Sequence, residues 1–480
     1  IPDPGNNASP MIGANSFSVP DTAYVRNIFV ASNAVLNIYE NGVLKISGEI
    51  MGEGNIDSRA GSIDMIGTDT QRISPDRFTN GTLKTLKVSN TGGTLSIYSE
   101  TDTLKVADKV IFGTSNATLK TNDRLVLLSS MNGTASIADM TSDGNRSGVY
   151  SGNRIIGNVV VERYIPEHYK AWQFLAAPAI GQTIKAAWQE NNSTLGNDQP
   201  GYGTILTSNV PDALAQGFDI YSPAGTSLKS FNAQTNAWEG VPSTLIPIQN
   251  NKGYMVFVRG DRSVNTASQA ATPTTLRITG KLYTPIDNPP AMVNVGADRF
   301  EAVGNPYASA IDFNKISKTG GIQDVFYVWD PRLTNGTTGT YGLGAYQTFV
   351  GLGDGTYRVI PGGGSYGDPG TNQPGYIQSG QAFLVRAAQS SGTMMFDEPN
   401  KVLGSAIVTR NAAVSNPRLM ANLSAVNSSN QPVLLDGSMI EINDRFSTAV
   451  DANDLIKLNN SSENIAVNVN GTMLVADRQQ

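Results

Sequence analysis

Between Val30 and Leu128, short pairs of apolar residues alternate with polar ones in the pattern of β-strands. Each pair places two side chains on one face of a strand, because successive side chains point to opposite faces. Turn formers such as Asn41-Gly42 and Gly92-Gly93 separate the pairs. The pattern predicts many short strands joined by tight turns, with the apolar pairs Leu36/Ile38, Leu44/Ile46, Ile63/Met65, Leu86/Val88, Leu95/Ile97, Leu104/Val106 and Leu125/Leu127.

These apolar pairs recur at a nearly constant interval. The steps from Leu44 to Ile63, Leu86, Leu104 and Leu125 are 19, 23, 18 and 21 residues. A repeat of about 20 residues is typical of one turn of a parallel β-solenoid, in which stacked turns share a single core. The alternative is an antiparallel sandwich, with a strand about every 8–12 residues. The short pairs and the regular interval favour a solenoid stalk in residues 1–165.

The middle of the chain contains an internal repeat. Residues 172–178 match 300–306, residues 218–223 match 326–331, and residues 252–259 match 379–386, in the same order. We expect two homologous β-sandwich-like units, at 166–290 and 291–402. Each should contain a strand that ends in proline at Pro223 or Pro331 and an apolar strand that closes on Arg259 or Arg386.

Alternating segments continue after Pro399. Residues 418–424 and 439–442 read as strands, and Asn470-Gly471 is a favoured hairpin turn. We expect a small C-terminal β-sandwich at 403–480. The predicted fold class is therefore all-β: an N-terminal parallel β-solenoid (β-helix), duplicated β-sandwich-like units and a small C-terminal β-sandwich.

Composition agrees with this fold and removes several chemistries. Charged residues make up 15% of the chain, against about 25% in an average domain, which disfavours salt-bridged helices. The absence of cysteine excludes thiol catalysis and disulfides, and the single histidine, His168, excludes a multi-histidine metal site. A net charge of −6 argues against nucleic acid as a partner.

No apolar run is long enough for a transmembrane helix. The sequence starts at Ile1 and shows no signal peptide, so we expect a part of a longer product. As a general base, His168 would need an orienting carboxylate and a nucleophilic serine, and no serine of the chain lies in a Gly-x-Ser-x-Gly motif. We therefore expect His168 on the surface or at a unit junction.

Tyrosines in or beside two Gly-rich insertions are the candidate ligand-binding residues. The insertions are 334–344 and 351–370, and the tyrosines are Tyr341, Tyr346, Tyr357 and Tyr366. Tyrosine rings on polar loops can stack on a ligand while the hydroxyls form hydrogen bonds. The alternative is that these tyrosines pack onto the sheet beneath them.

Carboxylates offer two further sites. Asp451 and Asp454 are weak calcium candidates because they place oxygen ligands in one turn, but they do not match an EF-hand loop, and Asx turns satisfy their own backbone without an ion. Asp57, Asp64 and Asp69 could lie on neighbouring solenoid turns and form a hydrolytic pair. Solvated turn carboxylates are the alternative reading of all three.

Three passages carry a resemblance to a known group of proteins. They are 157–166 leading into 174–178, then 303–312 with 326–331, and finally 446–451 with 454–459 and 463–465. In these passages the chain resembles the large surface proteins that the type IX secretion system of Bacteroidetes exports. Such proteins are often adhesin-like, with a β-solenoid stalk followed by β-sandwich modules.

This resemblance implies a secreted or cell-surface, outer-membrane-associated location, with the type IX secretion machinery as a partner during export. Asp21-Thr22-Ala23 and Asp102-Thr103-Leu104 resemble the short O-glycosylation acceptor pattern of this phylum. Thr22 and Thr103 are therefore candidate glycosylation sites.

Two functions remain open at this level. The first is a non-catalytic adhesin-like protein that presents loops to an extracellular carbohydrate or protein ligand, without a cofactor apart from the calcium candidate. The second is a β-helix carbohydrate-active enzyme, a polysaccharide hydrolase or lyase with accessory sandwich modules. A cleft with convergent carboxylates would favour the enzyme.

Overall fold

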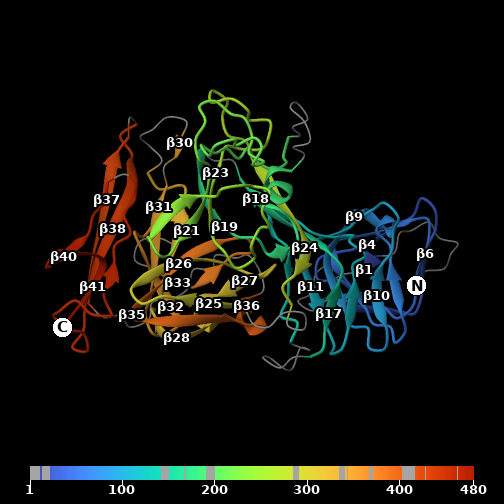
Figure 1. The fold of residues 1–480 in the computed structure, drawn as a ribbon. Coiled ribbons are helices and arrows are strands. Elements are labelled where there is room, and N and C mark those ends of the chain that lie inside the picture. The colour runs from blue at the N-terminus through green and yellow to red at the C-terminus, as the bar shows by residue number, and fades with distance from the viewer. Residues whose placement is uncertain are drawn as a thin grey trace.

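The computed structural model describes residues 11–12, 22–141, 151–166, 169–190, 200–284, 291–334, 341–342, 344–366, 371–402, 417–427, 429–461 and 463–480. The chain is all-β, as predicted. It runs from a solenoid at one end, through central sheets, to a separate C-terminal sheet at the other end (Figure 1). No helix in the described part of the chain is long and apolar enough to cross a membrane.

The N-terminal region is a parallel β-solenoid of about five turns, which confirms the fold predicted for it. Its second sheet is parallel and has the order β17-β12-β10-β8. The main sheet includes β2 (Thr22–Val25), β4 (Val35–Ile38), β5 (Val43–Ile46), β7 (Asn55–Met65), β9 (Phe78–Val88), β11 (Leu104–Phe112), β13 (Leu125–Leu127) and β18 (Val159–Ile165), together with the two-residue strands β1 (Met11–Ile12) and β16 (Ser136–Ile137). Those of the second sheet are β8 (Gln71–Ile73), β10 (Thr94–Ile97), β12 (Thr118–Lys120) and β17 (Arg154–Ile156).

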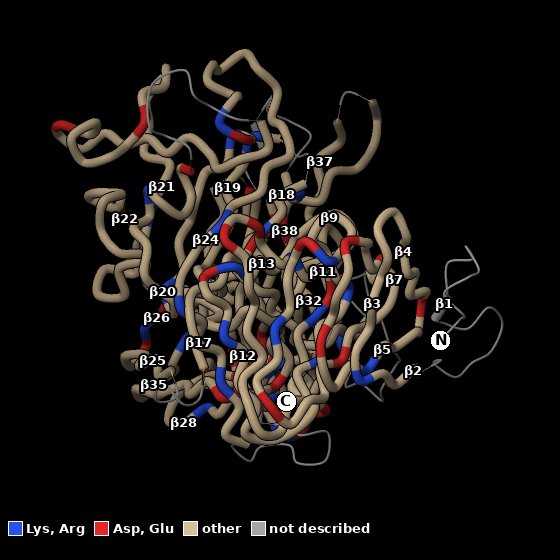
Figure 2. The backbone as a smooth tube through the Cα atoms, turned by 90° about the vertical axis from the view of Figure 1, so that its right-hand side faces the viewer, with Lys and Arg blue, Asp and Glu red and all other residues tan. Residues whose placement is uncertain are grey.

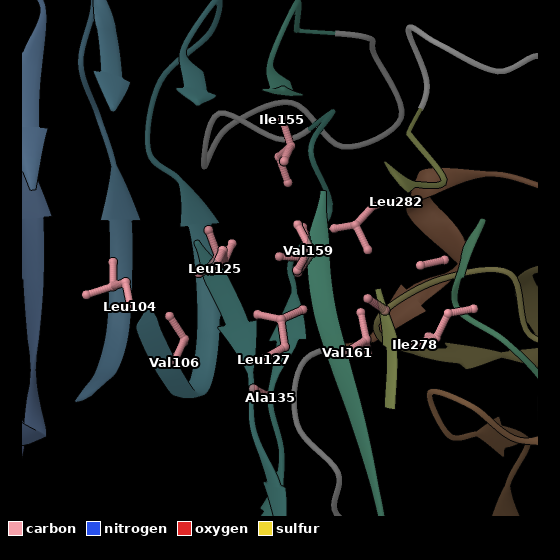
Figure 3. Packing of buried hydrophobic residues seen from close by; sticks show 14 of the residues in the cluster. Leu104, Val106, Leu125, Leu127, Ala135, Ile155, Val159, Val161, Ile278 and Leu282 are labelled. Carbon is pink, nitrogen blue, oxygen red and sulfur yellow. The ribbon is translucent and has the colours of Figure 1, made fainter. Parts of the chain in front are cut away.

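Apolar residues on successive turns stack into columns inside the solenoid. Leu44 pairs with Ile63, and Ile63 pairs with Leu86, as the interval predicts. The next step differs, because Leu86 pairs with Val110 and not with Leu104. Leu104 instead faces Leu125 on the following turn, and the two side chains lie side by side on neighbouring strands (Figure 3).

The long strand β11 explains this difference. Its register against β9 shifts between Val106 and Lys109, so Val106 in its first half pairs with Leu83 and Val110 in its second half pairs with Leu86. An apolar pair alone does not show which half of a strand faces which neighbour. The sequence interval therefore predicts the turns correctly but one column wrongly.

Buried polar side chains hold the turns of the solenoid. Asn90 is fully buried; its Nδ2 donates to the Asp69 carbonyl at 2.6 Å and its Oδ1 accepts from Gly93 N at 2.8 Å. Gln71 Nε2 donates to the Ile46 carbonyl at 3.0 Å. Since buried polar groups must find partners, neutral amides can cap the stacked turns without charge. Over the whole molecule, charged residues are likewise sparse, and acidic and basic residues are interspersed along the chain (Figure 2).

The main solenoid sheet continues past residue 165. Strand β24 (Thr274–Leu282) lies antiparallel to β18, and β20 (Ala179–Ile180) pairs with the other edge of β24. Both strands belong to the first expected unit by sequence. An antiparallel strand from that unit thus occupies the last edge of the parallel stack, where unpaired backbone groups would otherwise lie.

The two matched segments of each repeat pair with one another in both units. Strand β19 (Lys170–Leu175) lies antiparallel to β23 (Tyr254–Val258), and β26 (Arg299–Gly304) lies antiparallel to β35 (Ala382–Phe396). The sheets that contain them differ in length. The first has the order β22-β21-β23-β19-β30, and the second β25-β35-β29-β31-β32-β33, with β26 and β28 also paired with β35.

One expected strand is missing from the first unit. Residues 326–331 coincide with β29 (Val325–Asp330), but 218–223 contain no strand, so the prediction for that segment is wrong. Side-chain contacts hold this segment instead. Asp219 Oδ2 accepts from Leu206 N at 2.8 Å, and Asp219 forms an ion pair with Arg262 at 3.0 Å. The strand beside β23 is β21 (Leu228–Asn232), later in the chain.

The C-terminal residues form a five-stranded sheet that packs on the second unit. Its inner face carries Met439, Leu455 and Val475, which share one buried cluster with Tyr327 and Ile360 of the second sheet. Two sheets therefore face one another across a common core, in the manner of a sandwich. Its strands are β37 (Arg418–Val426), β38 (Pro432–Ile442), β39 (Leu455–Ile456), β40 (Val467–Val469) and β41 (Thr472–Gln479).

The remaining elements are short. In the central sheets they are β22 (Ala237–Gly240), β25 (Ala291–Val295), β28 (Ser317–Ile322), β30 (Tyr341–Gly342), β31 (Ala345–Gly351), β32 (Thr356–Ile360) and β33 (Asn372–Pro374). Others are β3 (Ile28–Val30), β6 (Ile50–Gly52), β14 (Ser129–Ser130), β15 (Gly133–Thr134), β27 (Ala310–Asp312), β34 (Tyr376–Ile377) and β36 (Lys401–Val402). The helical turns are η1 (Pro75–Arg77), η2 (Lys185–Gln189), η3 (Phe313–Lys315) and η4 (Glu398–Asn400).

Candidate ligand-binding site

A cavity of about 890 Å³ lies where the solenoid, the first unit and the second unit meet. Strand β18 and the residues after it line one wall, and β19 lines the next. The segment at Ala270 and Ala271 of the first unit adds to the wall, and the second unit contributes the end of β29, β31 and the segments around Ser365 and Tyr376. The site therefore exists only because these units pack together.

Aromatic rings form much of the cavity wall. Tyr169 is 45% exposed, whereas Trp329 and Phe349 are buried. Neighbouring rings fix two of them: Trp329 packs edge-on against Tyr346 at 4.9 Å, and Phe349 packs edge-on against Tyr366 at 5.5 Å between ring centroids. Rigid rings of this kind can stack on a ligand at little cost in conformational entropy.

Tyr366 is also a hydrogen-bonding group of the wall. Its hydroxyl accepts from Gln381 Nε2 at 2.8 Å, and Gln381 Oε1 accepts from Gln378 N at 3.0 Å. Burial, together with the nearby Asp330 carboxylate, raises the pKa of Tyr366 to about 12. The phenol thus keeps its proton at neutral pH and can donate it to a ligand.

Two arginines line the same cavity. Arg163 is half-buried; it donates to the Ser379 carbonyl at 3.2 Å, while its Nε is buried without a hydrogen-bond partner among the described residues. Burial lowers the pKa of Arg163, but a guanidinium stays charged in proteins. Arg332 is exposed at the cavity edge.

Asp330 lies behind the wall, and its carboxylate is occupied. It is fully buried, and it accepts from Arg332 N at 2.9 Å, from Ser365 N at 2.6 Å and from Ser365 Oγ at 2.7 Å. None of the described residues that line the cavity is acidic. The wall therefore presents aromatic faces, neutral amides and two cations.

Of the three predicted tyrosines whose side chains the structure describes, Tyr366 lines this cavity and Tyr346 and Tyr357 do not. Tyr346 lies on β31 and accepts from Trp238 Nε1 at 2.7 Å, and Tyr357 lies on β32 and donates to Asp324 at 2.8 Å. Both are buried, so their expected placement on exposed loops is corrected: they pack onto the sheet. Tyr341 lies in β30, beside Lys170 of β19, and its side chain lies outside the described residues.

Backbone hydrogen bonds from their own turn and from β41 engage the two calcium candidates. Asp454 accepts from Asp451 N at 2.7 Å and from Arg478 N at 2.8 Å, and Asp451 accepts from Asn453 N at 2.7 Å. No cluster of three metal-ligating side chains occurs among the residues the structure describes. Calcium binding at Asp451 and Asp454 stays a prediction.

The other candidates are distributed over the molecule. Thr22 is exposed on β2 and Thr103 is half-buried before β11, which leaves both as glycosylation hypotheses. His168 lies outside the described residues.

The three solenoid carboxylates have different surroundings. Asp57 forms an ion pair with Arg59 at 2.6 Å, and this contact lowers the pKa of Asp57. Asp64 is buried between Lys45 and Lys87, at 3.8 and 3.7 Å. Asp69 is exposed in the following turn. Cations of the solenoid wall thus neutralise the first two.

Sequence reasoning missed most of the cavity. Trp329 lies in the matched repeat segment 326–331, and Arg332 follows it directly. The repeat predicted a strand there and did not predict a binding site. Arg163 lies within β18, a strand that reads as structural. These residues are recognised as part of the cavity wall only because they lie together in the folded structure. Their spacing in the sequence does not indicate that they do.

The fold and the cavity define a class: a β-solenoid joined to antiparallel sheets, with an aromatic and arginine-lined cavity at the junction. Residues 202–473, more than half of the chain, match a family described as a domain of unknown function, DUF8693, and the chain belongs to that family. The match includes Trp329, Arg332 and Tyr366 but begins after Arg163. No curated protein and no solved structure matches the chain.

Proposed function

We propose that this chain is a non-catalytic, adhesin-like protein that binds an extracellular carbohydrate or protein at the junction cavity. The cavity itself carries the proposal: its volume of about 890 Å³ lies within the range of roughly 300–1,000 Å³ that is usual for ligand sites. Aromatic rings and a few fixed polar groups, as found here, are the usual lining of such sites.

The location belongs to the same proposal. The three passages that resemble type IX secretion substrates support export to the cell surface or the medium, with the secretion machinery as a transient partner. The solenoid would then hold the cavity at a distance from the surface, since stacked turns form a stiff rod.

A β-helix carbohydrate-active enzyme is the competing function, and the solenoid fold is compatible with it. Two of its three candidate carboxylates, Asp57 and Asp64, are paired with Arg59, Lys45 and Lys87, and the third, Asp69, is exposed in a turn. The described lining of the large cavity has no carboxylate to act as acid or base. These observations favour binding over hydrolysis.

Binding of the labelled chain to arrays of immobilised glycans and extracellular matrix proteins tests the proposal. We expect saturable binding that Tyr376→Ala lowers by about tenfold, equivalent to roughly 1.4 kcal/mol. Tyr24→Ala, which removes an exposed ring from the solenoid, is the matched control and should bind like wild type. Absence of binding on every surface, or release of shortened products from a polysaccharide, would contradict a purely binding role.

A further inference from the structure

The junction cavity combines positive charge with groups that suit a sugar. Arg163 and Arg332 both line it, and its described lining contains no carboxylate. Asp330, the nearby acid, is engaged by Ser365 and by Arg332 N. A ligand would therefore meet two guanidinium groups without a competing anion in the described wall.

Arg163 has unused hydrogen-bonding capacity in this wall. One terminal nitrogen donates to the Ser379 carbonyl at 3.2 Å, and its Nε has no partner among the described residues although it is buried. Because Nε is closed to solvent, a ligand would approach the terminal nitrogens of the guanidinium, which lines the cavity. A carboxylate is well matched to a guanidinium, because its two oxygens can accept two parallel N–H bonds.

The remaining wall suits the other parts of a saccharide. Tyr169 and Tyr376 are partly exposed rings at the cavity, and rings stack on the apolar faces of sugars. The Tyr366 hydroxyl accepts from Gln381 and so keeps its own proton for a ligand oxygen. Gln173 and Gln378 add amides that can both donate and accept.

We infer that the junction cavity binds a carboxylate-bearing oligosaccharide, with Arg163 and Arg332 recognising the carboxylate and the tyrosines holding the sugar rings. This inference rests on the proposed binding function and names its ligand class. A volume of about 890 Å³ is in the upper part of the usual range for ligand sites, which suits a short oligosaccharide better than one sugar.

Isothermal titration calorimetry with paired probes tests this ligand class. The probes are trigalacturonic acid, 3′-sialyllactose and a hyaluronan tetrasaccharide, each compared with its methyl ester, which has no charge. We expect at least one acid to bind about tenfold more tightly than its ester. We also expect its affinity to fall as salt is raised, because the contact is partly exposed.

Two arginine variants locate the contact. Arg332→Gln should weaken binding of the acid by about tenfold and leave the ester unchanged, whereas Arg445→Gln, an exposed arginine of the C-terminal unit, should change neither. Arg332 is exposed, so this change should leave the fold intact. Arg163→Gln should have a larger effect, with thermal melting as the check on its folding.

The outcomes separate the two proposals. Equal binding of acids and esters would overturn the carboxylate inference and leave the proposed binding function standing. Tighter binding of an acid that Arg332→Gln does not affect would also overturn it, because the anion would then lie elsewhere. Failure of every glycan and every matrix protein would overturn both.

Discussion

At the scale of single residues, Glu190 combines burial with an ion pair. Its carboxylate lies 3.3 Å from Arg277, which also contacts Glu162 at 2.9 Å. Burial is the larger effect and raises the pKa of Glu190 from 4.5 to about 7, against the opposing attraction of Arg277. The folded state therefore holds this proton more tightly than the unfolded chain.

The free energy of unfolding should consequently fall as the pH rises through the pKa of Glu190. The contribution of this group is fully present below its unfolded pKa of 4.5 and is lost as pH rises through about 7. Relative to Glu190→Gln, we expect wild type to lose about 2 kcal/mol of unfolding free energy between roughly pH 5 and 8. Urea denaturation at several pH values measures this.

Glu40→Gln provides the control for this prediction. Glu40 is exposed in a solenoid turn, so its change should leave the pH dependence as in wild type. A Glu190→Gln curve parallel to that of wild type over the whole range would contradict the assigned burial effect.

At the scale of elements, the solenoid depends on columns of aliphatic residues. Leu86 is fully buried, and it lies between Ile63 and Val110 on neighbouring turns. Each turn alone exposes its apolar face, and stacking removes that face from water. A gap in the column therefore affects the turns on both sides.

Leu86→Ala should destabilise the solenoid by about 2–5 kcal/mol, because it removes buried methyl groups and leaves a cavity between rigid neighbours. Lys84→Ala, on the same strand but half-buried, should change stability by less than about 0.5 kcal/mol. Guanidinium unfolding followed by circular dichroism compares the two. Similar losses in both variants would mean that the column is not what stabilises the stack.

At the scale of the whole molecule, contacts between distant segments join the units. Glu398 accepts from Met140 N of the solenoid at 2.8 Å and pairs with the buried Lys401 at 2.8 Å. Ile137 N donates to the Ala308 carbonyl at 2.8 Å. Asn250 Nδ2 donates to the carbonyls of Ala177 and Pro306, at 2.8 Å each, and so ties together the two matched proline turns.

Glu398→Ala should loosen the solenoid from the second unit. The change leaves the Lys401 ammonium buried without its partner, which typically costs about 3–5 kcal/mol, and frees the Met140 amide. We expect faster hydrogen exchange at Met140 and Ile137, with exchange inside the early turns, for example at Leu44, unchanged. Glu463→Ala, at an exposed site, is the control.

Faster exchange over the whole chain after Glu398→Ala would contradict local undocking and indicate global destabilisation instead. Unchanged exchange at Met140 would show that this contact does not hold the units together. Mass spectrometry of peptides that cover Met140 and Leu44 distinguishes these outcomes.

Local pattern determined a large part of this structure. The apolar pairs became the solenoid strands, and the low charge of the chain is explained by turns built from neutral residues such as Asn90 and Gly93. The repeat was visible because 172–178 and 300–306 each supply a strand that pairs with its matched partner. These features depend on side-chain alternation and turn chemistry, which neighbouring residues decide.

Tertiary packing alone decided the rest. Tyr357 and Tyr366 look alike in sequence, yet one is buried in the second sheet and the other lines a cavity. Arg163 and Arg332 both line that cavity although they lie far apart in the chain. The cavity arises from the way three units contact one another. Such long-range contacts depend on the shape and burial of residues over the whole chain, and a local sequence pattern does not reveal them.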